Sequence, residues 1–198
     1  MAVNRKPILK TCRELGISPM VMGVGKETKR DPNAGKRKKV SEYGMQLKEK
    51  QKLRFIYGVL EGQFRHTYER AQKMEGQAGE NLITCLECRL DNVIFRMGLS
   101  LTRRESRQLV THGHFLVNGQ RVDIPSYSVK VGDVISLSEK SKKSEKFKQI
   151  AEGTADRLVP AWLDVNKDQQ TAKVLRLPVK EDLDYEVEEH LIVELYSK

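Results

Sequence analysis

The segment of residues 102–122 constrains the fold most, because it predicts a capped helix followed at once by a tight β-hairpin. Thr102 and Glu105 have the S/T-x-x-E spacing of a capping box, and Gly113 stands where the helix would end. Asn118-Gly119 lies between two short apolar runs, which is the strongest short-range signal for a hairpin with a type I′ turn. The segment therefore predicts a helix over 103–112 and a strand on each side of the turn.

Helical periodicity gives the 103–112 helix two different faces. At about 100° per residue, Ser106, Leu109 and Val110 fall on one half of the helical wheel. The other half holds the cationic and polar side chains, namely Arg103, Arg104, Arg107, Gln108, Thr111 and His112. We expect the first half to face a core and the second half to face a polyanion.

The rest of the chain alternates helical and extended patterns. The predicted helices cover about 44–57, 61–74, 82–97 (straight or kinked) and 139–152, and the predicted strands cover 115–117, 120–122, 134–137, 162–165 and 173–177. Residues 190–196 suit a helix or a strand, and we favour the helix because acidic residues precede it.

These elements predict an α+β fold, in which helices pack on a small, mostly antiparallel sheet. We divide the chain into a basic N-terminal extension (1–40), a helical domain (41–90, completed by 178–198) and an α/β domain (91–177). The first 40 residues have one small apolar cluster, so we expect them to become ordered on a partner.

The charge of the chain is distributed unevenly. Its 36 Lys and Arg against 27 Asp and Glu give a net charge of +9, and residues 1–50 alone hold 13 basic and 5 acidic side chains. Residues 181–198 are acidic. This asymmetry favours nucleic acid as the partner of the N-terminal and central parts of the chain. An anionic membrane surface is the rival partner, but the Lys36–Lys39 run has no apolar helix face beside it. No apolar run suits a membrane span or a signal peptide, so we expect a cytoplasmic protein.

The stretch from Arg89 to Asp133 resembles the RNA-binding module named after ribosomal protein number four of the small subunit. The motifs that carry this resemblance are Arg89-Leu90-Asp91, Thr102-Arg103-Arg104, Gln108-Leu109-Val110, His112-Gly113, Val117-Asn118-Gly119 and Val131-Gly132-Asp133. The module, at about 89–150, occurs in several RNA-handling families. The flanks Ser41–Lys52 and Glu189–Lys198 are similar to the bacterial ribosomal protein family itself, so the resemblance covers about residues 41–198.

The resemblance implies a structural constituent of the small ribosomal subunit. Such a protein binds small-subunit ribosomal RNA directly, nucleates assembly of the subunit body and contributes to translational accuracy. The implied neighbours are ribosomal proteins five and twelve, and repression of its own messenger RNA is an open further role. The resemblance implies no enzymatic activity, no cofactor and no membrane, and it places the protein in the ribosome.

We expect the RNA-binding residues to come from every part of the chain. They are Lys36, Arg37, Lys38, Lys39, Tyr43, Lys48, Lys50, Lys52, Arg54, Arg65, Arg103, Arg104, Arg107, Gln108, Thr111, His112, His114, Asn118 and Arg121. In the acidic tail we expect Glu188, Glu189 and Tyr196 to contact a neighbouring protein. Aromatic residues form 6% of the chain and no row of them suggests base stacking, so recognition of RNA shape and phosphates is favoured.

The cysteines give only weak support for a metal site or a redox site. Many members of the resembled family carry four zinc-binding cysteines near the N-terminus, but this chain has only Cys12 there, which is too few ligands for a zinc site. Cys85 and Cys88 have the spacing of a redox or metal pair, yet they fall inside a helical stripe, so we expect packing. The three cysteines predict no disulfide framework.

Two other functions remain as alternatives. An RNA-modifying enzyme, such as a pseudouridine synthase, can borrow the same module, but it needs a catalytic domain for which too few residues remain. His112 and His114 have no nucleophile or carboxylate pair beside them in the sequence, so phosphate or base contact is favoured over catalysis. The other alternative is an RNA-binding regulator, a free RNA chaperone or antitermination factor, which would not sediment with ribosomal subunits.

Overall fold

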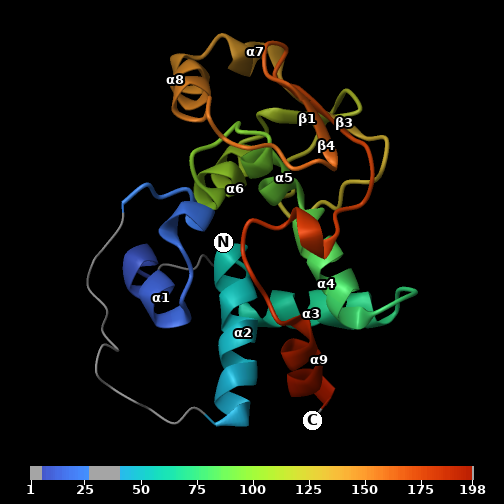
Figure 1. Ribbon diagram of the computed structural model, residues 1–198. Helices are drawn as coiled ribbons and strands as arrows, with labels where there is room; N and C mark the ends of the chain where they lie inside the picture. Colours follow the sequence, from blue (N-terminus) through green and yellow to red (C-terminus); the bar gives the residue numbers. More distant parts are fainter. Residues whose placement is uncertain (1–5, 27–40, 198) are drawn as a thin grey trace. The chain divides into compact units, whose positions relative to one another are not determined.

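The computed structural model describes residues 6–26 and 41–197, which form two compact units (Figure 1). The helical unit comprises the described residues of Met1–Leu82 together with Asp184–Lys198, and the sheet unit comprises Ile83–Leu183. Helix α4 (Ala78–Glu87) begins in the first and ends in the second. The sheet unit thus begins before residue 91, where the sequence placed the start of the α/β domain.

The helical unit is built around α2. Its elements are α1 (Ile8–Leu15), the 3-10 helix η1 (Pro19–Met22), α2 (Glu42–Ile56), α3 (Glu61–Gln72) and α9 (Glu189–Ser197). Helices α1 and α9, from opposite ends of the chain, both pack against α2 (Figure 1). The C-terminal segment is therefore a helix, with Glu189 in its first turn, where the helix dipole favours an acid.

The expectation that the whole N-terminal segment becomes ordered only on a partner is wrong for residues 8–24, which are folded within this chain. Cys12 is fully buried, and Leu15, Val21 and Met22 are also buried. These side chains do not form a core by themselves, because α1 packs against α2 of the same chain. Residues 27–40, which include the predicted RNA-binding Lys36, Arg37, Lys38 and Lys39, lie outside the described residues.

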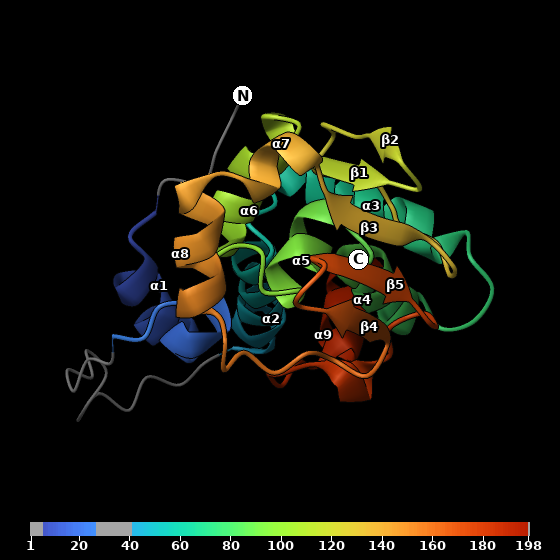
Figure 2. The same cartoon turned by 90° about the horizontal axis from the view of Figure 1, so that it is seen from above.

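The sheet unit combines an antiparallel sheet with helices on one of its faces. Its strands are β1 (Phe115–Val117), β2 (Gln120–Arg121), β3 (Val134–Leu137), β4 (Leu163–Asn166) and β5 (Thr171–Val174), and its further helices are α5 (Leu90–Arg96), α6 (Arg103–Thr111), α7 (Glu139–Lys142), α8 (Glu145–Gly153) and the 3-10 helix η2 (Lys180–Asp182). The strand order is β2-β1-β3-β5-β4, and every pairing is antiparallel (Figure 2). The α+β class is confirmed.

The core of the sheet unit lies between the sheet and the helices α5, α6 and α8 (Figure 2). Phe115, Ile135 and Ala172 point into it from three neighbouring strands, and Phe147 of α8 meets the Phe115 ring edge-on, with 6.2 Å between the centroids. Alternate strand residues, such as Lys173, are exposed. Alternation of this kind is typical of an antiparallel sheet with one face packed on a core.

The helix predicted over 82–97 is in fact two helices, α4 and α5. Arg89 between them has an extended backbone, with φ −68° and ψ 136°, and forms an isolated antiparallel bridge with Ser128. The Leu90 N–H donates to the Tyr127 carbonyl at 2.8 Å. A loop nearly 40 residues further along the chain therefore interrupts the helical hydrogen bonds, and the apolar stripe alone cannot reveal this.

The predicted type I′ hairpin turn is confirmed. Asn118 and Gly119 both have positive φ, 49° and 79°. The Asn118 side chain donates to Asp133 Oδ1 at 2.8 Å and accepts from the Val134 N–H at 2.9 Å, so it ties the turn to β3. We therefore assign Asn118 a structural role, and its contact with RNA stays a prediction because its side chain is exposed.

Gly119→Val should destabilise the sheet unit by about 1–3 kcal/mol, because a β-branched residue strains a backbone at positive φ. A Cβ at residue 119 would have no neighbour within 4 Å, so the loss comes from the backbone and not from a clash. Denaturant unfolding measures it. Gln120→Val, at the next exposed strand position, is the control and should change stability by about 0.5 kcal/mol at most. Equal stability of the two variants would contradict the turn assignment.

Candidate nucleic-acid interface

Helix α6 is fixed at its start and along its apolar half. The Thr102 hydroxyl accepts from the Glu105 N–H at 3.2 Å, and Glu105 Oε2 accepts from the Leu101 N–H at 2.8 Å, one residue earlier than in a standard capping box. Leu109 and Val110 are buried in the core, as the helical wheel predicts. The polar half of α6 is therefore held in one orientation.

Arg103 lies inside the sheet unit, not on its surface. Its side chain is buried, its Nε donates to Asn92 Oδ1 at 2.9 Å, and its guanidinium lies 4.3 Å from the centroid of the Phe95 ring. We therefore withdraw Arg103 from the predicted phosphate contacts and assign it a structural role. The helical wheel could not show this, because it does not reveal that polar groups of α5 lie on that side of α6.

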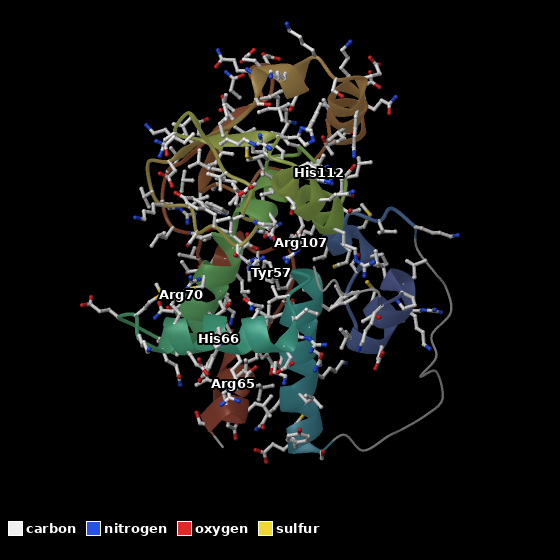
Figure 3. All side chains as sticks on the ribbon, turned by 180° about the vertical axis from the view of Figure 1, so that it is seen from behind. Tyr57, Arg65, His66, Arg70, Arg107 and His112 are labelled. Carbon is white, nitrogen blue, oxygen red and sulfur yellow. The ribbon has the colours of Figure 1, made fainter. Side chains whose placement is uncertain are left out.

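Arg107 stands at the border between the interior and the surface. Its side chain is 29% exposed, and its Nη1 lies 3.4 Å from Oδ2 of the buried Asp91. The same carboxylate accepts two hydrogen bonds from Arg89. Arg107 projects from α6, five residues before the C-cap residue His112 (Figure 3). It is therefore anchored on one side and accessible on the other.

The accessible polar side chains of α6 continue onto the β-hairpin. We call this set the α6 face; it consists of Arg104, Arg107, Gln108, Thr111, His112, His114 and Arg121. Arg121 Nη2 donates to the His112 carbonyl at 3.2 Å, where a cation is favoured by the helix dipole. Gly113, with φ +72°, leaves room for this guanidinium, which occupies the space that a Cβ at residue 113 would need. The structure thus gathers seven of the predicted residues on one surface.

The surroundings of His114 show how cationic this end of the α6 face is. Its Nδ1 lies 2.8 Å from the Ser141 hydroxyl, and its ring meets Phe147 edge-on. Burial lowers the pKa of His114 below its ordinary value of 6.5, and the nearby His112, Lys146 and Arg121 lower it further. Lys146 is a neighbour that we did not predict. A Lys-rich helix over 139–152 was expected, but the pattern did not show which lysine faces His114.

The predicted cations of α2 are largely engaged within the helical unit. Lys50 and Arg54 both bind the Glu61 carboxylate, at 2.7 and 2.8 Å, and Lys52 binds Glu49 at 2.7 Å. Tyr43 and Lys48 are exposed, as expected for contact residues. The ion pairs reduce the positive charge that this helix can offer to RNA.

Helix α3 and its C-cap present basic side chains that we did not predict, beside the predicted Arg65. His66, Arg70 and Lys73 are exposed on it, and Arg65, His66 and Arg70 project from the helix in Figure 3. Glu69 lies 3.2 Å from both Arg65 Nε and His66 Nδ1. The burial of Phe64, Tyr68 and Ala71 on the opposite side follows the helical period, so periodicity within the predicted 61–74 helix could have found this face.

Glu61→Gln should make the stability of the helical unit depend less on pH. Partial burial raises the pKa of Glu61, but hydrogen bonds and charge from Lys50 and Arg54 outweigh this and lower it below 4.5. A lowered carboxyl pKa adds stability above the unfolded pKa, which is lost as pH falls through the folded value. We expect the variant to be less stable than the parent at pH 7 by about 1 kcal/mol or less, after solvent screening.

Unfolding measured from pH 7 to pH 3 tests this expectation. The difference in unfolding free energy between parent and variant should shrink toward the acidic end of this range, because Glu61, with its lowered pKa, becomes protonated there. Glu69→Gln, which changes an exposed carboxylate on the same helix, is the matched control. A difference that stays constant over the whole range would contradict the proposed charge interaction.

Two of the three predicted protein-contact residues have internal roles. The Tyr196 ring stacks on Tyr68, with 4.6 Å between centroids, and its hydroxyl donates to Glu61 at 3.3 Å; burial, together with Glu61, raises the Tyr196 pKa. Glu189 is half-buried against Gly79, where a Cβ would lie 2.6 Å from Glu189 Cγ. These contacts dock α9, and a contact of either residue with a neighbouring protein stays a prediction. Glu188 is exposed.

The three cysteines are reduced, buried thiols. Cys85 and Cys88 pack at the end of α4, as expected. Among residues 6–26 and 41–197, no three His, Cys, Asp or Glu side chains gather closely enough to hold a metal ion. None of the described helices is both long and apolar enough to cross a membrane.

Comparison with known proteins identifies the family. Residues 4–87 match the family model described as the ribosomal protein S4/S9 N-terminal domain, and residues 88–135 match the S4 domain. The chain is 55% identical over 199 residues to small ribosomal subunit protein uS4 of Lachnospira eligens, with 100% of both chains covered. It belongs to the uS4 family. The uS4 protein of Agathobacter rectalis is 52% identical over the full length of both chains, and that of Clostridioides difficile is 62% identical over 162 residues, 82% of this chain and 78% of the relative.

The matches confirm the resemblance noted in the sequence. Within this uS4 chain, the S4 domain contains α5, α6 and the β1–β2 hairpin, and therefore every residue of the α6 face. The other family model covers the helical unit up to α4. The α6 face thus lies entirely in the domain that defines the family's RNA-binding module.

Proposed function

We propose that the protein is a structural component of the small ribosomal subunit and binds its ribosomal RNA directly through the α6 face. Membership of the uS4 family supports this, and it supports a structural and not an enzymatic role. The observation that carries the choice of surface is the α6 face itself, where Arg104, Arg107 and Arg121 lie beside two histidines on a rigid helix and hairpin. The ribosome in the cytoplasm is the corresponding location.

The chemistry of the α6 face suits phosphates and folded RNA. Arginine guanidiniums and histidine, threonine and glutamine side chains donate hydrogen bonds to phosphate and ribose oxygens. Rigid elements hold these donors, so they can match the shape of an RNA junction. We infer that Tyr43 and Lys48 of α2, together with Arg65, His66 and Arg70 of α3, add contacts from the helical unit.

Finer roles follow from the same proposal. A protein that binds ribosomal RNA through two units can nucleate assembly of the subunit body, and it can influence decoding accuracy by fixing RNA structure. We propose ribosomal proteins five and twelve as neighbours, with the exposed Glu188 facing a protein and not RNA. Binding to its own messenger RNA would use the same α6 face.

Sedimentation of a cell lysate tests the proposal against its alternatives. A ribosomal protein should travel with small subunits at low salt, whereas an RNA chaperone or antitermination factor would remain in a soluble pool. The purified chain should also bind small-subunit ribosomal RNA in a salt-sensitive manner and leave its bases unmodified after incubation. A soluble pool without subunit association, or a modified base, would overturn the proposed function.

A further inference from the structure

We propose that Asp91 is a positioning residue, which holds Arg107 in the orientation that an RNA phosphate requires. The inference rests on the proposed function, because it assumes that the α6 face binds RNA. It adds a buried carboxylate to the groups on which RNA binding depends. A carboxylate cannot itself attract a phosphate, because both are negatively charged.

The geometry around Asp91 is that of a fixed anchor. Its side chain is 6% exposed, and Arg89 holds it with two hydrogen bonds, from Nε to Oδ1 at 3.1 Å and from Nη2 to Oδ2 at 2.7 Å. The Asp91 N–H donates to the Pro125 carbonyl at 3.1 Å, which ties α5 to the loop between β2 and β3. Paired hydrogen bonds of this kind restrict a carboxylate strongly.

Arg107 meets this anchor from α6. Its Nη1 lies 3.4 Å from Asp91 Oδ2, while its side chain is 29% exposed. A guanidinium has five N–H donors in a planar fork, so one edge can bind the carboxylate while another edge reaches a phosphate. Asp91 therefore limits the motion of the Arg107 side chain before RNA arrives, and less conformational entropy is lost on binding.

The charges around Asp91 indicate that it positions Arg107 and does not compete with a phosphate for it. Asp91 carries one negative charge between two arginines, so the group of three keeps a net charge of +1. The contact from Arg89 to Asp91 Oδ2 is 0.7 Å shorter than the contact from Arg107, so Asp91 is compensated mainly by Arg89. A phosphate approaching Arg107 therefore meets a cation that the carboxylate orients without neutralising it.

The neighbouring residue of α5 supports this assignment. Asn92 accepts from Arg103 Nε at 2.9 Å, and Arg103 lies one helical turn before Arg107 on α6. Two consecutive residues of the first turn of α5 thus hold two arginines spaced i, i+4 on α6. This arrangement sets the rotation of α6, and Asp91 is the member that acts on the exposed arginine.

A double-mutant cycle with the full chain and small-subunit ribosomal RNA transcribed in vitro tests the inference. Asp91→Asn should weaken RNA binding by about 3- to 10-fold with its salt dependence retained, because the phosphate contact still forms. Arg107→Ala should lower the log-log salt slope by about 0.7 to 0.9, the value for one lost contact. In the Arg107→Ala background, Asp91→Asn should have no further effect on affinity. Asp164→Asn, an exposed change of the same type on β4, is the control.

Each other outcome has a definite meaning. Tighter binding by the Asp91→Asn variant would show competition and overturn the inference, and an equal loss in the Arg107→Ala background would show a general effect on folding and overturn it as well. If Asp91→Asn does not fold, Asp91→Glu keeps the charge, displaces the carboxylate and should still weaken binding; unchanged affinity would overturn the inference. If the parent chain does not bind RNA, the proposed function itself fails.

Discussion

Replacing Glu87 by Ala should destabilise the sheet unit by about 3–5 kcal/mol, because it leaves a buried positive charge without its main partner. Glu87 is 1% exposed, and its carboxylate accepts from Arg96 Nε at 3.2 Å, from Arg96 Nη2 at 3.0 Å and from Asn92 Nδ2 at 2.9 Å. Arg96 is also buried, so water cannot replace the lost carboxylate. Denaturant unfolding of the purified chain measures the loss.

Two further variants show whether charge or packing causes the loss. Glu152→Ala removes an exposed carboxylate from α8 and should change stability by about 0.5 kcal/mol at most. Replacing Glu87 and Arg96 together by Leu should recover much of the stability, because an apolar pair leaves no buried charge uncompensated. A loss below about 1 kcal/mol for Glu87→Ala would mean that the pair contributes little to folding.

Replacing Arg104, Arg107 and Arg121 together by Ala should weaken binding to small-subunit ribosomal RNA by about two orders of magnitude near 0.15 M salt. Each lost phosphate contact lowers the log-log salt slope by about 0.7 to 0.9, so three contacts lower it by about 2 to 2.7. Folding should be little affected, since Arg89 still compensates Asp91 when Arg107 is removed. Titrations at several salt concentrations give both the affinity and the slope.

Location, and not charge alone, should determine this effect. The control variant replaces Lys130, Lys173 and Lys180 by Ala, which removes the same charge from exposed positions of the sheet unit outside the α6 face. It should lose much less affinity and keep most of the slope. Equal losses in the two triple variants would mean that RNA responds to the net charge of the unit, and the α6 face would lose its special role.

Much of the fold could be predicted because local chemistry specifies it. Asn118-Gly119 is one of the few pairs that strongly favour a type I′ turn, and Thr102 begins α6 through a hydrogen bond within its own first turn. The break at Arg89 could not be predicted, because the loop around Tyr127 imposes it from a distance in the sequence. The order of α1 was missed for the same reason, since its partner α2 lies beyond residue 40.

The sequence could predict which residue types form the candidate site, but not which of them pair with one another within the fold. Helical periodicity placed Arg104 and Gln108 correctly on an accessible surface of α6. It could not show that Arg103 turns inward to Asn92, or that Glu61 binds Lys50 and Arg54, because each pairing depends on how two helices meet. A count of cations along the chain therefore overestimates the positive charge that is available to RNA.

The burial of the three thiols makes them natural reporters of local opening. Burial also raises the pKa of Cys12, so little of it is in the thiolate form that reacts with labelling reagents. A thiol that is hidden in the folded state reacts only when its surroundings open, and its labelling rate then measures the free energy of that opening. Cys12 lies in the helical unit, whereas Cys85 and Cys88 lie in the sheet unit. The native chain can thus report on the two units separately without any engineered cysteine.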